Sequence, residues 1–253
     1  MLALALDTTT RTGGVALVDD DRIVEERVGD PLREPAERLP GEPLALLQAH
    51  GVALASIDLF AVASGPGSFT GLRVGIAAMQ GFAFVGGRRM AGIPALEALG
   101  HVGSAGRAPG SIVAVWMDAR RRDVFAALYR VTAAALFEPE HLAPIDGPLV
   151  GEPSAVVAAW LTALGGQQGV WIGDGATLFA ETIGRHVPLP EILPHPVLAG
   201  AIGRLAITRA RRGEAVSPAA VRPLYLRRPD AELDREKRSR KMFIVTRDGD
   251  VEN

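Results

Sequence analysis

The sequence predicts an α/β fold of two lobes, because a unit of strand, turn and returning strand occurs twice, with a glycine-rich linker between the copies. In the first copy, the apolar run Leu2–Leu6 ends at Asp7, turns through Thr8–Thr10 and returns as Gly14–Val18. A third strand is expected at Arg22–Val28. The first lobe is therefore predicted to begin with a sheet.

The second copy begins with the apolar run Ile112–Met117, which ends at Asp118 and returns as Val124–Tyr129. Its likeness to the first copy indicates an internal duplication. Between the copies lies the breaker-rich stretch Gly103–Gly110, of the kind found at lobe boundaries. The duplication and the linker together favour two lobes over one large domain.

A strand, a glycine loop and a helix follow one another inside the first lobe, at Leu59–Ala63, Ser64–Phe69 and Thr70–Val85. Apolar residues at helical spacing predict a last helix at Val197–Arg211, which would return to the first lobe. We divide the chain into an N-terminal lobe, a C-terminal lobe, a returning helix and segment, and a charged tail, at residues 1–102, 111–196, 197–226 and 227–253. A short edge strand is predicted in the tail at Met242–Thr246.

The composition is that of a folded protein outside the membrane. Of the 253 residues, 48% are hydrophobic and 22% are charged, and the net charge of -2 provides no overall attraction to nucleic acid phosphates. We therefore expect no strong direct tRNA binding by this chain alone. It has no cysteine, no basic leader and no apolar run long enough to span a bilayer. A cytoplasmic location is expected.

The two strand-end aspartates are candidates for a nucleotide cleft. Aspartates at strand ends in duplicated lobes that face one cleft are expected of the superfamily of actin, sugar kinases and heat-shock ATPases. The hydroxyl groups behind Asp7 would suit a metal-bound phosphate, although an ordinary polar turn is the alternative. The turn Arg120–Arg122 would suit a phosphate, an acidic partner or plain solvent. We predict a vestigial cleft that binds ATP or ADP weakly at Asp7, Thr8, Thr9, Asp118, Gly173 and Gly175.

Other site motifs are missing from the sequence. The glycine loop lacks the lysine of a phosphate-binding P-loop, so close packing is the alternative to ligand contact. Thr70 is placed to cap the helix that follows the loop. None of the five histidines forms a pair at the spacing that puts two metal ligands on one helical face, and no serine elbow is evident. We predict neither a metal site nor a catalytic residue.

The helix after the glycine loop carries apolar side chains around its whole circumference, which is typical of a helix buried on every side. Its small residues Gly71, Gly75, Ala78 and Gly81 would let another helix approach closely. We predict that a second subunit covers it. A helix enclosed within its own lobe is the alternative.

Four segments, Leu4–Thr9, Gly65–Gly75, Met117–Arg120 and Pro223–Arg227, make the chain resemble the TsaB (YeaZ) family. The resemblance implies an actin-like ATPase fold, ribonuclease H-like, with duplicated lobes. It also implies a role in tRNA threonylcarbamoyladenosine (t6A) modification as the partner of a paralogous transferase, TsaD, and of a small ATPase, TsaE. The two histidines that hold the metal in TsaD have no counterpart in Arg33–Glu37, so the resemblance implies an accessory subunit that requires no cofactor.

The family's pairing surface is made by two helices, at about Ala36–His50 and Thr70–Val85 in this sequence. Pro40 and Pro43 are expected to break or kink the first of them, so that the helix begins only at Pro43. We predict a four-helix bundle with the partner, or a homodimer when the partner is absent. The predicted contacts are Leu44, Leu47, Thr70, Gly71, Leu72, Val74, Gly75, Ala78, Met79 and Phe82.

Two other functions stay open at this point. A nucleotide-dependent kinase of the same fold would use Asp7 or Asp118 to position metal and phosphate. A peptidase is suggested only by names once attached to relatives, and the sequence offers no metal site or triad for it.

Overall fold

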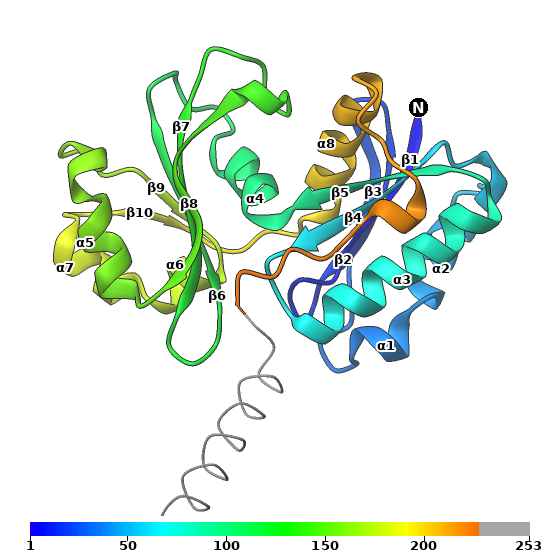
Figure 1. The fold of residues 1–253 in the computed structure, drawn as a ribbon, viewed down its shortest axis with the longest axis horizontal. Helices are drawn as coiled ribbons and strands as arrows, with labels where there is room; N and C mark the ends of the chain where they lie inside the picture. Colours follow the sequence, from blue (N-terminus) through cyan, green and yellow to red (C-terminus); the bar gives the residue numbers. More distant parts are fainter. Residues whose placement is uncertain (228–253) are drawn as a thin grey trace, which may run out of the picture.

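The computed structural model describes residues 1–227, and these residues form two lobes built on two five-stranded mixed sheets (Figure 1). The predicted two-lobed α/β fold is confirmed. The charged tail and the strand predicted at Met242–Thr246 lie outside the described residues, apart from the first residue of the tail, Arg227. No helix within residues 1–227 combines the length and the apolar character needed to cross a membrane.

The first sheet has the strand order β3-β2-β1-β4-β5. Strands β1, β2 and β3 pair antiparallel, whereas β4 and β5 continue from β1 in parallel. Helices α1, α2 and α3 cover its outer face (Figure 1). The elements of this lobe are β1 (Leu2–Asp7), β2 (Gly14–Asp19), β3 (Arg22–Val28), α1 (Pro35–Arg38), α2 (Gly41–Ala49), η1 (Leu54–Ser56), β4 (Leu59–Gly65), α3 (Phe69–Val85) and β5 (Arg89–Pro94).

The second sheet has the order β10-β9-β6-β7-β8, with helices α5, α6 and α7 on its outer side (Figure 1). Three tryptophans, Trp116, Trp160 and Trp171, meet in this outer layer with ring centroids 5.2 to 6.2 Å apart. The elements are β6 (Ile112–Asp118), β7 (Val124–Val131), η2 (Pro139–His141), β8 (Leu142–Gly151), α5 (Pro153–Leu164), β9 (Val170–Ile172), α6 (Asp174–Leu178), α7 (Ala180–His186) and β10 (Glu191–Leu193).

Two helices, α4 (Ala95–Gly103) and α8 (Ala199–Arg211), lie between the two sheets. One continuous apolar core contains the inward residues of both sheets together with buried side chains of α4 and α8, such as Leu99 and Leu205. Helix α8 packs on β1, β2 and β4, although it follows the whole second lobe in the sequence. The lobes are thus joined by a shared apolar layer as well as by covalent links.

The first of the two predicted interface helices is divided. Its N-terminal part is the single turn α1, and α2 starts after Pro40. The expected proline break is therefore present, but the prediction that the helix begins only at Pro43 is wrong. Helix α2 begins at Gly41, because a proline in the first turn of a helix lacks only a donor that has no partner there.

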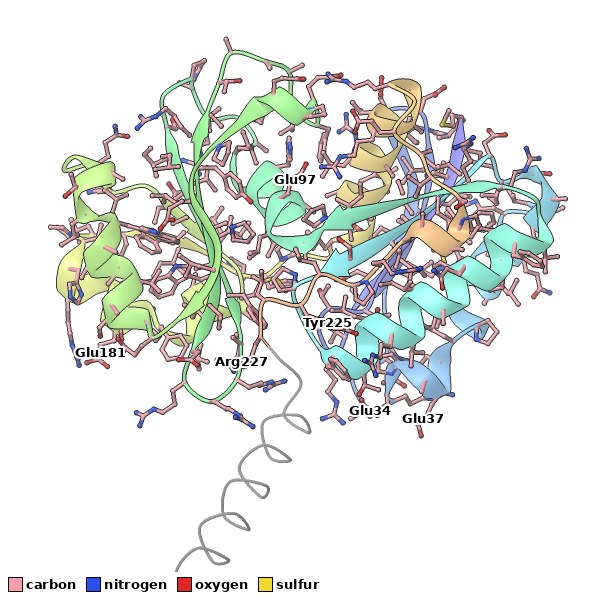
Figure 2. All side chains as sticks on the ribbon, viewed as in Figure 1. Glu34, Glu37, Glu97, Glu181, Tyr225 and Arg227 are labelled. Carbon is pink, nitrogen blue, oxygen red and sulfur yellow. The ribbon has the colours of Figure 1, made fainter. Side chains whose placement is uncertain are left out.

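The chain from Glu214 to Arg227, which we call the C-terminal strap, runs along the first lobe and reaches the second (Figures 1 and 2). Val216 and Met90 exchange backbone hydrogen bonds of 2.8 and 2.9 Å, so the strap starts on the edge strand β5 and includes η3 (Pro218–Ala220). Its far end is Arg227, which donates to the carbonyl of Ala119 over 2.9 Å. The strap therefore ties the first sheet to the β6–β7 connection.

Candidate functional site

The first strand-end aspartate, Asp7, is buried at the end of β1, with 2% of its surface exposed. Its Oδ1 accepts hydrogen bonds from the backbone N–H and the hydroxyl of Thr9, at 2.8 and 2.7 Å. Burial raises the pKa of Asp7, because the charged carboxylate is poorly solvated there, and the two hydrogen bonds from Thr9 act in the opposite direction. The hydroxyl of Thr8 is buried and has no hydrogen-bond partner.

The glycines after β4 pack directly against this turn. A Cβ atom on Gly75 would lie 2.2 Å from the Thr8 hydroxyl, and one on Gly71 would lie 2.2 Å from the Thr8 carbonyl oxygen. A Cβ atom on Gly67 would lie 2.6 Å from Thr9. The prediction that Gly71 and Gly75 admit a partner's helix is therefore wrong for this conformation, because the chain's own β1 turn occupies their side of α3.

The second strand-end aspartate, Asp118, is only partly covered. Its backbone N–H donates to the carboxylate of Asp174 over 2.9 Å, and its own carboxylate accepts from the N–H of Arg120 over 2.8 Å. Gly173 and Gly175 are buried against β6, where a Cβ atom would lie 2.2 Å from the Trp116 carbonyl and 2.8 Å from the backbone of Met117, respectively. These two glycines allow close packing around β6, and their backbone N–H groups already have acceptors in the chain.

Sequence reasoning missed His195, which lies beside this cleft. Its Nδ1 is 4.0 Å from Asp174 Oδ1, and neither ring nitrogen has a hydrogen-bond partner although both are buried. Asp174 of the second lobe is also close enough to Asp7 of the first for its carboxylate to contribute to the raised pKa of Asp7. Residues 1–227 contain no group of three or more histidine, aspartate or glutamate side chains arranged to hold a metal ion.

Helix α3 is covered on one side only, so the alternative of a helix enclosed within its own lobe is wrong, and its covering by a second subunit stays a prediction. Ser68, rather than the predicted Thr70, caps it by accepting from the N–H of Gly71. Phe84 and Val85 expose 82% and 80% of their surface. We call the exposed stripe the open face of α3, and it consists of Thr70, Arg73, Ala77, Gly81, Phe84 and Val85.

The predicted partner contacts are divided between this face and the core. Leu44 is exposed, whereas Leu47 is buried against the sheet. On α3, Thr70 belongs to the open face, and three residues at its margins are half-buried: Val74, Ala78 and Phe82. The others are covered by their own lobe: Gly71, Leu72, Gly75 and Met79.

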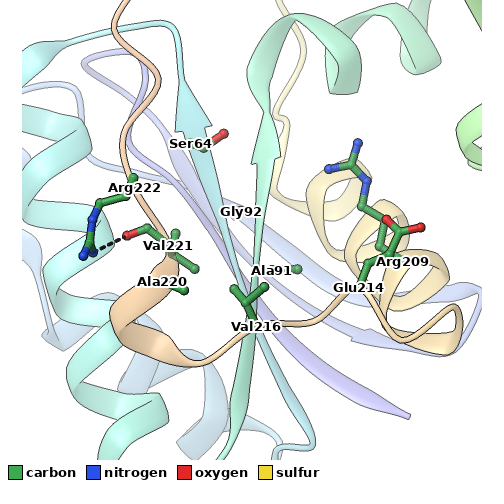
Figure 3. Close-up of a pocket in the computed structure, with 9 residues that line it drawn as sticks. All are labelled: Ser64, Ala91, Gly92, Arg209, Glu214, Val216, Ala220, Val221 and Arg222. Carbon is green, nitrogen blue, oxygen red and sulfur yellow. Dashed lines mark hydrogen bonds between the residues drawn. The ribbon is translucent and has the colours of Figure 1, made fainter.

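A separate cavity of about 230 Å³ lies between β5, the end of α8 and the strap, with Gly92 and Val221 among its lining residues (Figure 3). The half-buried arginine of its lining, Arg209, is already paired, because both carboxylate oxygens of Glu97 lie 2.7 Å from its Nη2. Sequence reasoning pointed to none of these residues as a site.

The comparisons with known proteins place this geometry in a family. The family model described as "TsaD: tRNA N6-adenosine threonylcarbamoyltransferase" matches residues 33–144. The tRNA threonylcarbamoyladenosine biosynthesis protein TsaB of Escherichia coli is 28% identical over 239 residues, which cover 90% of this chain and 95% of that one. The structure of YeaZ from Pseudomonas aeruginosa superposes with a TM-score of 0.70 and 27% identity, over 88% of this chain and 100% of that one. The chain belongs to the TsaB (YeaZ) family.

Two mycobacterial proteins are also similar to this chain. An uncharacterized protein of Mycobacterium tuberculosis is 33% identical over 232 residues, or 90% of this chain and 93% of its own length. A second, from Mycobacterium leprae, is 32% identical over 91% of this chain, which spans 56% of that longer protein. With TsaB proteins among its relatives, this chain is a member of a t6A biosynthesis family.

Proposed function

We propose that this chain is the non-catalytic partner subunit that binds and activates a TsaD-type transferase in t6A modification. The observation that carries the proposal is the open face of α3, which presents Phe84, Val85 and Gly81 to solvent. Large apolar side chains exposed side by side are typical of protein interaction sites. The family relationship supports the choice of the transferase as the partner.

The shape of the open face suits a helical partner. A Cβ atom on Gly81 would meet no other atom within 4 Å, so a partner's helix can approach the backbone there. Phe84 stands one turn further on and would fill a pocket between the helices. Covering it would contribute about 1.5–3 kcal/mol. Helix α2 lies on the same side of the sheet (Figure 1) and would add Leu44 to a four-helix bundle.

The test is co-purification with the TsaD-type protein of the same organism. Phe84→Asp and Gly81→Leu are expected to weaken the complex by about ten- to a hundredfold, since one loses the apolar anchor and the other blocks close approach. The matched control is Leu178→Asp, because Leu178 is an exposed leucine of the second lobe, with 61% of its surface accessible. Threonylcarbamoyl transfer to tRNA by the reconstituted complex should fall in parallel. Equal pairing by all three variants would refute the proposed surface.

The same face would form the homodimer of the isolated chain. Sizing of the purified protein should then give a dimer for the wild type and a monomer for Phe84→Asp. A dimer that survives this substitution would place self-association elsewhere. We further propose that the complex also recruits a TsaE-type ATPase and works in the cytoplasm.

A nucleotide-dependent kinase is the alternative, and the two strand-end aspartates favour it. We propose only weak ATP or ADP binding in the cleft, because Asp7 is buried and bonded to Thr9, and the glycines of α3 pack against the adjacent Thr8. Calorimetry with magnesium and ATP checks this. Tight binding with turnover by the isolated chain would favour the kinase over the partner subunit.

A further inference from the structure

The connection between β6 and β7 has an unusual backbone. Arg120, Arg121 and Arg122 all have positive φ angles, of 61°, 54° and 66°. This left-handed conformation is unfavourable for residues that carry a Cβ atom, and glycine or asparagine usually occupies it. We call residues 119–123 the arginine turn. Three successive left-handed arginines are a strained arrangement, and such strain is concentrated at functional sites.

The ends of the arginine turn are fixed. The N–H of Ala119 donates to the carbonyl of Asp123, and the N–H of Asp123 donates to the carbonyl of Arg120, each over 3.0 Å. Arg227 at the end of the strap donates to the carbonyl of Ala119 and pairs with the carboxylate of Asp123. The backbone of the arginine turn is therefore held at both ends, which lowers the backbone entropy lost when its side chains bind a ligand.

The arginine turn is also a local excess of positive charge on a chain whose net charge is -2. All three arginines are exposed, and Arg120 has 82% of its side chain accessible. The carboxylate of Asp123 is occupied by Arg227, and that of Asp118 lies 3.4 Å from Arg120. Arg122 makes no ion pair within residues 1–227. Several other arginines, such as Arg209 and Arg212, form ion pairs with glutamates.

Guanidinium groups bind phosphate oxygens in a bidentate way, and several adjacent ones favour a chain of phosphates over a single anion. We propose that the arginine turn binds the phosphate backbone of the tRNA that the partner transferase holds. This inference rests on the proposed function, which supplies both the RNA and the neighbouring subunit. The overall charge of the isolated chain would keep its own affinity for RNA low, so the contact operates within the complex.

The turn lies where a partner seated on α3 would be its neighbour. Tyr225 of the strap accepts a hydrogen bond from Arg73 on the open face of α3, over 2.9 Å. Two residues later, Arg227 holds the arginine turn, and Figure 2 shows Tyr225 and Arg227 along the same side of the molecule. A transferase seated on α3 would therefore lie beside the turn, and its bound tRNA would be within reach.

The test measures binding of an unmodified tRNA transcript to the complex of the full chain with its transferase, over a series of salt concentrations. The double variant Arg121→Gly/Arg122→Gly removes two charges, while glycine accepts the left-handed backbone, so folding is preserved. We expect affinity to fall about tenfold near 0.1 M salt and the salt slope to decrease by about 1 to 2. Arg121→Lys/Arg122→Lys should retain most of the affinity.

The matched control is Arg22→Ala/Arg185→Ala, which removes two exposed arginines from β3 and α7 and should leave tRNA affinity within about twofold. Unchanged tRNA binding by the glycine variant in an intact complex would overturn the inference while leaving the proposed function standing. Loss of the complex itself would show a protein contact at the turn, and loss of ATP binding alone would show a nucleotide contact. Either result would also overturn it.

Discussion

The two copies of the strand-aspartate-turn unit have opposite surroundings. At the end of β1, Asp7 is 2% exposed and bonded to Thr9, and the glycines of α3 press against the turn. At the end of β6, the side chain of Asp118 is 18% exposed and is followed by three arginines that face solvent. The first copy is closed by packing and the second is open and charged. Duplicated backbone geometry therefore does not imply a duplicated binding function.

The largest expected effect comes from placing a side chain in the space beside the buried turn that follows β1. Gly75→Leu would drive a side chain into the buried Thr8, so we expect a loss of about 3 kcal/mol in the free energy of unfolding, measured with urea. Gly81→Ala on the open face is the control. It should be neutral or stabilising by up to about 1 kcal/mol, because alanine favours the helix and meets no neighbour. Equal losses from both would contradict the assignment of the two faces.

The buried carboxyl of Asp7 predicts a dependence of stability on pH. Its pKa is raised above the ordinary value of 3.8, so the folded state binds the proton more tightly than the unfolded state. The contribution of Asp7 to the free energy of unfolding is therefore fully present below pH 3.8 and is lost as the pH rises through the raised pKa. Asp7→Asn keeps an oxygen for Thr9 and should be more stable than the wild type at neutral pH, because it removes a buried charge.

The measurement is a set of unfolding curves for Asp7→Asn between pH 3 and 8. The control is Asp118→Asn, which changes the strand-end aspartate of the second lobe. The advantage of Asp7→Asn should shrink as the pH is lowered. The Asp118 variant should change stability less, since its carboxylate is in contact with water. A destabilised Asp7→Asn at pH 7 would mean that the folded protein needs the charged form.

A smaller effect is expected at the strap. Arg227→Ala removes a hydrogen bond to Ala119 and an ion pair with Asp123, with an expected loss of about 1 kcal/mol. Hydrogen exchange should accelerate at residues 119–123, whereas Arg222→Ala, whose side chain bonds only to carbonyls of the strap itself, should leave that exchange unchanged. If hydrogen exchange at residues 119–123 is unchanged in both variants, the strap does not position the arginine turn.

The smallest effect is the relief of backbone strain in the arginine turn. Arg122→Gly replaces a left-handed arginine with the residue that tolerates this conformation best, so the free energy of unfolding should rise by about 0.5 kcal/mol. The gain is limited because glycine also makes the unfolded chain more flexible. Differential scanning calorimetry against the wild type measures it, and a lower melting temperature would contradict the strain at this position.

The sequence predicted those parts of the fold that depend on local patterns. Strands β1, β2 and β6 were apparent from apolar runs that end at polar turns, and the proline break before α2 was apparent from Pro40. Strand β8 was not predicted, because proline, glycine and aspartate interrupt it in Leu142–Gly151. Its pairing with β7 compensates for these poor strand formers, and no local pattern reveals such pairing.

The candidate site was predicted less well, since its details depend on contacts between distant segments. The small residues of α3 showed that another segment can approach this helix closely. They did not show that Gly75 packs against Thr8 of the same chain, whereas Gly81 faces solvent. His195 lies between two prolines in a loop, and only the folded chain brings it near Asp174. A lone histidine there gives no signal in sequence. The exposure of Phe84 likewise depends on which side of α3 packs on the sheet, and the sequence of the helix alone does not show this.

The position of helix α8 in the sequence affects the order in which the two lobes can fold during synthesis. Because it packs on β1, β2 and β4 after the second lobe has been synthesised, the part of the inner sheet face that α8 covers stays exposed until more than 200 residues have left the ribosome. The second lobe, whose strands and outer helices are contiguous in sequence, can condense earlier. Vectorial synthesis thus completes the lobes in the reverse of their order along the chain, and the nascent first lobe is the stage at which chaperone protection would matter most.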